Sequence, residues 1–194
     1  HIPVHLGSMA YAMVDLVESR SWRTGDMLIL NDPYRGGTHL PDITLVAPVF
    51  ISGSLVGFCA NRAHHADIGS DAPGSMPVSR ALDEEGVLIP PTLLMKNAEV
   101  DEAFLQSLLQ RLNSPDTSRG DFNAQIAANL LGAGRLQELV ADAGAEAFEQ
   151  QESNLQTWAE SLVLQSLACI PGGQYQFQDY LDDDGYGHTD IPIR

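Results

Sequence analysis

The sequence predicts an α+β fold: a mixed, partly antiparallel sheet with a β-hairpin that carries a metal site, followed by a helical segment. Two apolar runs, residues 43–50 and 55–60, flank a two-residue turn at Ser52-Gly53, a pattern typical of a β-hairpin. Between residues 99 and 168, apolar side chains recur at helical spacing instead. Residues 174–180 alternate polar and apolar side chains, as half-buried strands do.

These patterns divide the chain into three parts. Residues 1–95 form a strand-rich part with the candidate metal site, residues 96–170 form a helical segment, and residues 171–194 begin a further β segment. The chain of 194 residues starts with histidine, and residues 190–194 have the pattern of an interrupted strand. We therefore expect a fragment of a longer chain.

The N-terminal part is predicted from its caps and apolar runs. Ser8 is expected to cap a helix over residues 9–17. Residues 26–31 have the pattern of a buried strand, which ends in a turn at residues 31–33. Asp32 serves either that turn or a ligand, and the sequence leaves both roles open.

The segment after the hairpin is irregular. Residues 69–80 are rich in proline and glycine, as expected of a substrate loop or of a plain connection. Ser75 lies in this loop without a Gly-x-Ser-x-Gly context, which argues against a nucleophile. Residues 87–89 are predicted to form a short strand that ends at Pro90-Pro91.

Three helices are predicted in the helical segment, over residues 99–112, 121–143 and 145–168. Their apolar stripes indicate helix packing rather than a cofactor site. Gly132 and Gly134 weaken the second helix and mark either a kink or a close contact.

Charge and cysteine content exclude several classes of partner. The formal net charge of −16 argues against binding to nucleic acid or to an anionic membrane surface. No apolar run reaches the length of a membrane span. Cys59 and Cys169 are far apart and lack a CxxC partner, which favours a reducing compartment. We therefore expect a cytoplasmic protein.

The hairpin brings two groups of polar residues together. With a two-residue turn, Ile51 pairs with Ser54, and counting back along both strands places Asp42 opposite Ala63. His39 then lies near the start of one strand, close to the end of the other, where His64, His65 and Asp67 follow one another. Paired strands lie about 5 Å apart, so these groups share one end of the sheet.

Imidazole and carboxylate ligands suit zinc, manganese or iron. We predict His39, Asp42 and His64 as ligands of a divalent metal, since three protein ligands leave a position open for chemistry. His65 follows His64 on an extended chain and points the other way, toward substrate or a supporting contact. Each residue also has an ordinary alternative: Asp42 capping a turn, Asp67 forming an Asx-turn and His39 lying in a polar loop.

Several longer motifs resemble those of the hydantoinase B/5-oxoprolinase family, which includes the α subunits of acetone and acetophenone carboxylases. The resemblance covers nearly the whole chain, and its motifs occupy residues 31–34, 36–42, 64–69, 73–75, 85–91 and 120–125. Ser70 departs from the family, which usually has a second glycine there. Asn123 and Gln125 lie in the last motif, either as structural amides or as ligand contacts.

The resemblance implies a function and a set of roles. A metal held by a His-x-x-Asp pair and a later histidine maps onto His39, Asp42 and His64. His65 or Asp67 would transfer protons, and Glu85, in another family motif, is a further candidate. The chain lacks a Walker A loop and a dinucleotide fingerprint, so ATP is expected on an A-type partner subunit or domain.

The leading prediction is therefore the B-type part of an ATP-dependent cyclic-amide hydrolase acting on 5-oxoproline or a hydantoin. A first alternative is the α subunit of an ATP-dependent ketone carboxylase, which would share the metal ligands. A second is a non-catalytic interaction domain whose histidines only stabilise loops.

Overall fold

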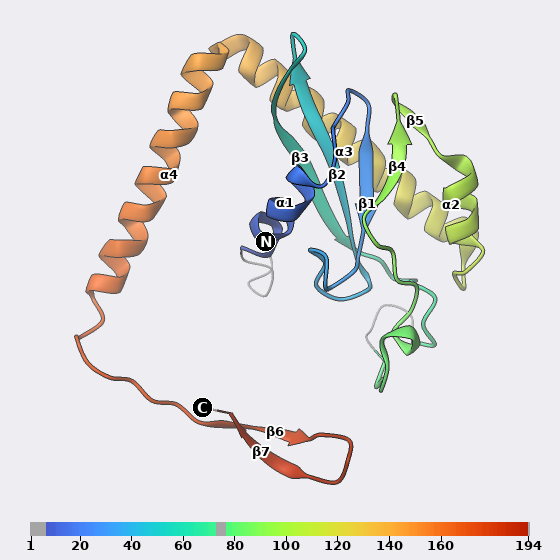
Figure 1. The fold of residues 1–194 in the computed structure, drawn as a ribbon, viewed down its shortest axis with the longest axis vertical. Coiled ribbons are helices and arrows are strands. Elements are labelled where there is room, and N and C mark those ends of the chain that lie inside the picture. Colours follow the sequence, from blue (N-terminus) through green and yellow to red (C-terminus); the bar gives the residue numbers. More distant parts are fainter. Residues whose placement is uncertain (1–6, 73–76, 194) are drawn as a thin grey trace. The chain divides into compact units, whose positions relative to one another are not determined.

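The computed structural model describes residues 7–72 and 77–193, so the Pro73-Gly74-Ser75 motif lies outside the described residues. The chain divides into two compact units, His1–Leu139 and Val140–Arg194. The first unit contains a five-stranded sheet of order β3-β2-β1-β4-β5 (Figure 1). Its strands are β1 (Met27–Leu30), β2 (Asp42–Ile51), β3 (Ser54–His64), β4 (Thr92–Lys96) and β5 (Glu99–Val100).

The α+β class is confirmed, and each pairing in the five-stranded sheet is antiparallel, which makes the sheet more regular than the mixed one predicted. The helices are α1 (Ser8–Glu18), η2 (Leu82–Glu84), α2 (Glu102–Leu109), α3 (Pro115–Ala143) and α4 (Ala145–Ala168). The prediction for α4 was correct at both ends. Helix α3 begins earlier than predicted, at Pro115, since proline is well tolerated in the first turn of a helix.

Helices cover both faces of the sheet. On one face, strand residues such as Ile29 and Leu45 join a buried cluster with Leu105 of α2 and Phe122 of α3. On the other face, Leu28, Leu30 and Val46 pack against Leu16 of α1. Figure 1 shows α1 and α3 on opposite sides of the strands. Burial on both faces explains why the strands have continuous apolar runs rather than strict alternation.

The hairpin has the predicted turn but a different register. Ser52 and Gly53 have φ angles of 51° and 83°, and Ile51 pairs with Ser54 as expected. The register then shifts between Val49 and Phe50. Since Phe50 pairs with Leu55 and Val49 with Gly57, Val56 is an extra residue of a β-bulge. The bulge places Asp42 opposite His64, so the predicted pairing with Ala63 was wrong by one residue.

Two further local predictions were wrong. Residues 87–89 form no strand, because they bind the Asn31 side chain: the Ile89 amide donates to Asn31 Oδ1 at 2.6 Å. The strand of this region is β4, which the sequence pattern did not reveal. At α1 the N-cap residue is Gly7, while the Ser8 hydroxyl accepts a hydrogen bond from Arg62.

The second unit contains α4 and a two-stranded hairpin of β6 (Asp179–Asp183) and β7 (Thr189–Ile193). The strand predicted over residues 174–180 overlaps β6 only at its last two residues, and residues 174–178 are exposed. Within residues 7–72 and 77–193, no helix combines the length and apolar character needed to cross a membrane.

Candidate metal centre

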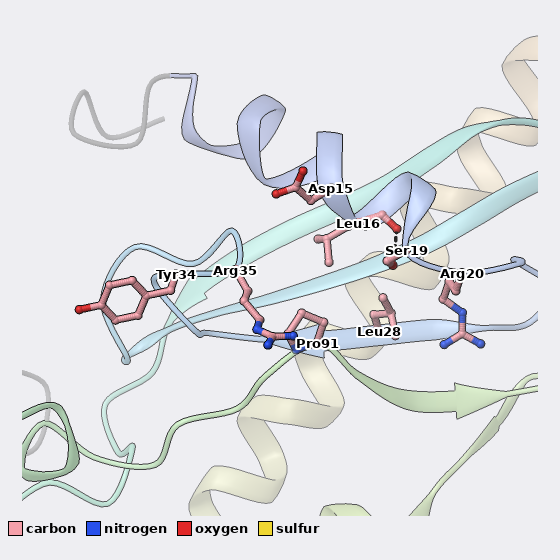
Figure 2. Close-up of a pocket in the computed structure, with 8 residues that line it drawn as sticks. All are labelled: Asp15, Leu16, Ser19, Arg20, Leu28, Tyr34, Arg35 and Pro91. Atoms are coloured by element: carbon pink, nitrogen blue, oxygen red, sulfur yellow. Dashed lines mark hydrogen bonds between the residues drawn. The ribbon is translucent and has the colours of Figure 1, made fainter.

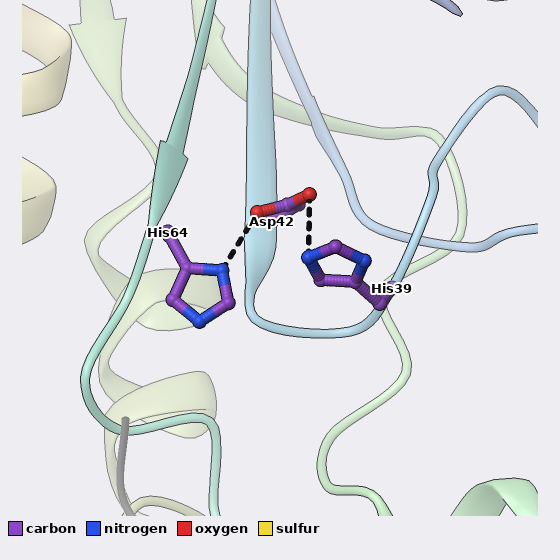
Figure 3. Close-up of side chains that lie close together, drawn as sticks. All are labelled: His39, Asp42 and His64. Carbon is purple, nitrogen blue, oxygen red and sulfur yellow. Dashed lines mark hydrogen bonds and ion pairs between the residues drawn. The ribbon is translucent and has the colours of Figure 1, made fainter. Parts of the chain in front are cut away.

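Asp42 is the centre of a three-residue cluster at the end of the hairpin. Its Oδ2 lies 2.9 Å from His39 Nε2, and its Oδ1 lies 2.9 Å from His64 Nδ1 (Figure 3). The Asp42 side chain is 2% exposed, whereas those of His39 and His64 are 24% and 40% exposed. One ligand atom from each residue can be chosen so that all lie within 4.8 Å of one another. The three residues predicted as ligands are therefore brought together.

The cluster depends on a tightly packed loop between β1 and β2. The Gly37 amide donates to the Asp32 carbonyl at 2.8 Å, and the Asn31 side chain donates to the Leu40 carbonyl at 2.8 Å. A Cβ on Gly37 would lie 2.2 Å from the Asn31 carbonyl oxygen, so only glycine fits. This packing fixes the chain that carries Thr38 and His39.

Two residues that the sequence patterns did not reveal support Asp42. The Thr38 hydroxyl donates to Asp42 Oδ2 at 2.6 Å. The Arg62 guanidinium donates to Thr44 Oγ1, Ser8 Oγ and the Gly36 carbonyl, and it joins β2, α1 and the loop. Burial lowers the pKa of Arg62, and the nearby Asp42 carboxylate partly offsets that shift. Strand alternation could have found Arg62, which lies two residues before His64 and on the same face.

His65 points away from the cluster, as predicted. Its Nε2 lies 2.8 Å from Gln125 Oε1, and its ring lies against Phe122 with centroids 4.7 Å apart. Gln125 Nε2 donates to the Ile43 carbonyl and to Asn61 Oδ1, so Gln125 Oε1 accepts and His65 Nε2 carries the proton. Burial lowers the pKa of His65, although the hydrogen bond to Gln125 opposes the shift. The imidazole is therefore neutral at pH 7.

Asp67 is held by the polypeptide around it. Its Oδ1 accepts hydrogen bonds from the Gly69 amide and Asn113 Nδ2, and its Oδ2 accepts from the Ser114 amide and the Ser118 hydroxyl. Burial raises the pKa of Asp67, but these hydrogen bonds outweigh burial and leave the pKa below its ordinary value. The contacts correspond to the Asx-turn alternative and also hold the start of α3.

The other two acidic candidates have local partners. Glu85 follows η2, and its Oε1 accepts a hydrogen bond from Ser79 Oγ at 3.1 Å. Asp32 Oδ1 accepts from the Tyr34 amide at 2.9 Å, the contact of a turn-forming aspartate. Neither residue belongs to the three-residue cluster, which was found among the described residues.

A separate pocket of about 390 Å³ lies beside α1 (Figure 2). Leu16, Leu28 and Pro91 form its apolar part, and Arg20 and Arg35 also line it. Arg20 pairs with Asp26 at 3.2 Å, and Arg35 lies 3.8 Å from Asp32. Because carboxylates already balance both cations, this pocket is a poor match for an anion.

Comparison with known proteins identifies the family. The family model described as hydantoinase B/oxoprolinase matches residues 1–194. The chain belongs to this family. A 5-oxoprolinase of Dictyostelium discoideum is 35% identical over 192 residues, which are 94% of this chain and 15% of that protein. A relative from Pseudomonas sp. (strain NS671), named as the B-type part of a D-/L-hydantoinase, is 30% identical over 184 residues, which are 93% of this chain and 31% of that protein.

Two solved structures share the family fold. The ATP-dependent caprolactamase from Pseudomonas jessenii superposes with a TM-score of 0.86 at 30% identity, over 96% of this chain and 33% of that chain. A nucleotide-free acetone carboxylase gives a TM-score of 0.67 at 25% identity, over 75% of this chain and 20% of that chain. The chain thus spans a third or less of these proteins, and this member of the hydantoinase B/oxoprolinase family corresponds to one part of them.

Proposed function

We propose that the chain is the metal-binding domain of an ATP-dependent cyclic-amide hydrolase of the hydantoinase B/5-oxoprolinase type. One observation carries the proposal: the ligand atoms of His39, Asp42 and His64 converge within 4.8 Å at one end of the hairpin. Two imidazoles and a carboxylate suit zinc, manganese or iron. The donor set therefore fits a divalent ion, and family membership supports the type of reaction.

The side chains around the cluster prepare it for a cation. Thr38 donates to Asp42, which fixes the plane of the carboxylate between the two rings. Arg62 anchors the Gly36 carbonyl and thereby the loop that carries His39. A bound ion would supply Lewis-acid polarisation of the ring carbonyl or an activated water.

For proton transfer, His65 is the better of the two predicted candidates. It is neutral because burial lowers its pKa, and its Nδ1 has no hydrogen-bond partner among the described residues. A neutral imidazole with a free lone pair can accept a proton. Asp67 instead uses both carboxylate oxygens for loop contacts. We assign Asp67, and Glu85 with its bond to Ser79, to supporting the loops.

ATP would bind on an A-type partner subunit or domain. The sequence carries no glycine-rich phosphate motif, whereas the caprolactamase and the acetone carboxylase are both described as ATP-dependent. The partner would activate the cyclic amide by phosphorylation, and the domain described here would complete the ring opening.

The test uses the complete protein with its ATP-binding partner. His39→Ala should remove the bound metal, measured by elemental analysis, and abolish ATP-dependent hydrolysis of 5-oxoproline or hydantoin. His188→Ala is the matched control, since His188 contacts Asp184 in the second unit and is exposed. Full metal content and turnover in His39→Ala would overturn the proposal. A lower melting temperature with unchanged turnover would instead favour a non-catalytic domain.

A ketone carboxylase is the second candidate function, because of the structural similarity to acetone carboxylase. The same three metal ligands would serve both reactions. ATP turnover that requires a ketone together with bicarbonate, and that a cyclic amide does not support, would decide for the carboxylase.

A further inference from the structure

We propose that the groove between β3 and α3 is the substrate pocket of this site, and that it selects compact cyclic amides without a carboxylate. The inference rests on the proposed function and adds the substrate class. The groove has a volume of about 510 Å³, within the range of small-molecule sites. His64 lines the groove and also belongs to the metal cluster, so a ligand in the groove lies beside the candidate metal centre.

Helix α3 presents a wall of small side chains to the groove. Asp121, Ala124, Gln125 and Ala128 follow one another at helical spacing and all line it. Phe122 and Ile126 of the same helix point into the core instead. On the opposite wall, Ala63 and Ala66 are equally small. Four alanines around one groove leave the space that a compact ring would fill.

The polar groups of the groove are held in place before a ligand arrives. Gln125 is fixed by the Ile43 carbonyl, Asn61 and His65, and its backbone carbonyl accepts a hydrogen bond from Asn61 Nδ2. Asp121 is exposed at the same groove and is close enough to interact with His65 electrostatically. An amide N–H of the ligand can donate to the Asp121 carboxylate. Such a contact recognises the ring amide itself.

The charges in the groove disfavour an anionic ligand. Arg62 is the permanently charged cation among the described residues that line it, and each of its three nitrogens already donates a hydrogen bond. Asp121 adds a negative charge, and the whole chain carries −16. A carboxylate on the ring would therefore meet repulsion without an uncommitted cation to offset it.

Hydantoin and 5-oxoproline test this selectivity, because both are five-membered cyclic amides and only the second carries a carboxylate at neutral pH. With the complete metal-loaded protein, ligand-observed NMR should show hydantoin binding at least about tenfold more tightly than 5-oxoproline. Asp121→Asn should narrow that ratio. Equal binding of the two, or tighter binding of 5-oxoproline, overturns the selectivity.

Filling the groove tests its location. Ala124→Leu and Ala128→Leu should each weaken hydantoin binding by about tenfold or more, with metal content unchanged. Ala127→Leu is the control, since Ala127 is exposed on α3 but does not line the groove. Unchanged hydantoin binding in both groove variants overturns this inference while leaving the metal centre intact. Loss of metal from His39→Ala, or its retention, tests the proposed function separately.

Discussion

At the scale of single residues, Thr38 is the residue whose replacement tests how Asp42 is oriented. Its hydroxyl donates to Asp42 Oδ2 at 2.6 Å, the same oxygen that lies 2.9 Å from His39 Nε2. Thr38→Val keeps the shape and removes the donor. We expect metal affinity to fall about 10- to 100-fold, as is usual when a contact behind a ligand is lost. Equilibrium dialysis with Mn²⁺ or Zn²⁺ measures the change.

Thr92→Val is the control for this change. The Thr92 hydroxyl donates to the Pro90 carbonyl at an exposed position and makes no contact with the cluster. It should leave metal affinity at the wild-type value. If both valine variants bind metal equally well, Thr38 does not orient Asp42 for a metal.

Asp67→Asn tests the carboxylate that ties residues 113–118 to the end of β3. Asparagine turns an amide nitrogen toward donors that now meet a carboxylate oxygen, so we expect a loss of about 1–3 kcal/mol in the free energy of unfolding at pH 7. The folded-state pKa of Asp67 lies below its ordinary value of 3.8. The contribution is therefore complete above pH 4 and declines as the pH falls through the folded-state pKa.

Urea unfolding at pH 7 and at pH 3 measures both parts of this prediction. The difference between wild type and Asp67→Asn should shrink at the lower pH, because both chains then lack the negative charge. Asp83→Asn, at an exposed position in η2, should change little at either pH. A constant difference across this range would show that the Asp67 charge does not contribute.

The three cluster residues could be predicted because a two-residue turn alone brings the ends of two strands together. Arg62 and Thr38 were missed for a physical reason. Their roles depend on which atoms of α1 and of the 36–42 loop fold back over β2, and local sequence carries no such information. The same holds for the Gln125 contact to His65, which joins residues sixty positions apart.

At the scale of secondary structure, two glycines of α3 form a matched pair. A Cβ on Gly132 would lie 2.6 Å from Cys59 Sγ of β3, whereas a Cβ on Gly134 would have no atom within 4 Å. Gly134→Ala should stabilise the protein by up to about 1 kcal/mol through helix propensity. Gly132→Ala should lose that gain and destabilise by about 1 kcal/mol or more, because the strand and helix are forced apart.

The double variant Gly132→Ala with Cys59→Ala checks the cause of this difference. Removing the sulfur should restore part of the stability lost in Gly132→Ala, measured by thermal and urea unfolding against Cys59→Ala alone. No recovery would mean that the contact with Cys59 is not the source of the cost.

Elements were predictable where a local pattern determined them and unpredictable where a distant partner did. Helix α4 and the turn at Ser52-Gly53 follow from residues within them. The bulge at Val56 does not, since Val49 and Phe50 fit a regular ladder equally well on paper, and it alone moves His64 opposite Asp42. Residues 87–89 look like a strand because Asn31, far away in sequence, supplies the hydrogen-bond partners of an extended segment.

At the scale of the whole molecule, excess negative charge complicates any measurement of metal binding. The chain has 26 acidic and 10 basic residues, so divalent cations collect weakly at its surface. Salt at physiological concentration screens such contacts beyond about 8 Å, whereas a buried ligand such as Asp42 is screened much less. Specific binding must therefore be separated from uptake by the surface.

Stability at physiological salt makes that separation. An ion bound only by the folded state at 100 times its dissociation constant should raise the free energy of unfolding by about 2.7 kcal/mol. Mn²⁺ is the preferred probe, since the cysteines Cys59 and Cys169 of an unfolded chain bind zinc and would reduce the effect. Asp42→Asn removes the carboxylate shared by both histidines and should abolish the stabilisation, while Asp83→Asn should retain it. Equal stabilisation of both variants would assign the effect to surface charge and not to the hairpin cluster.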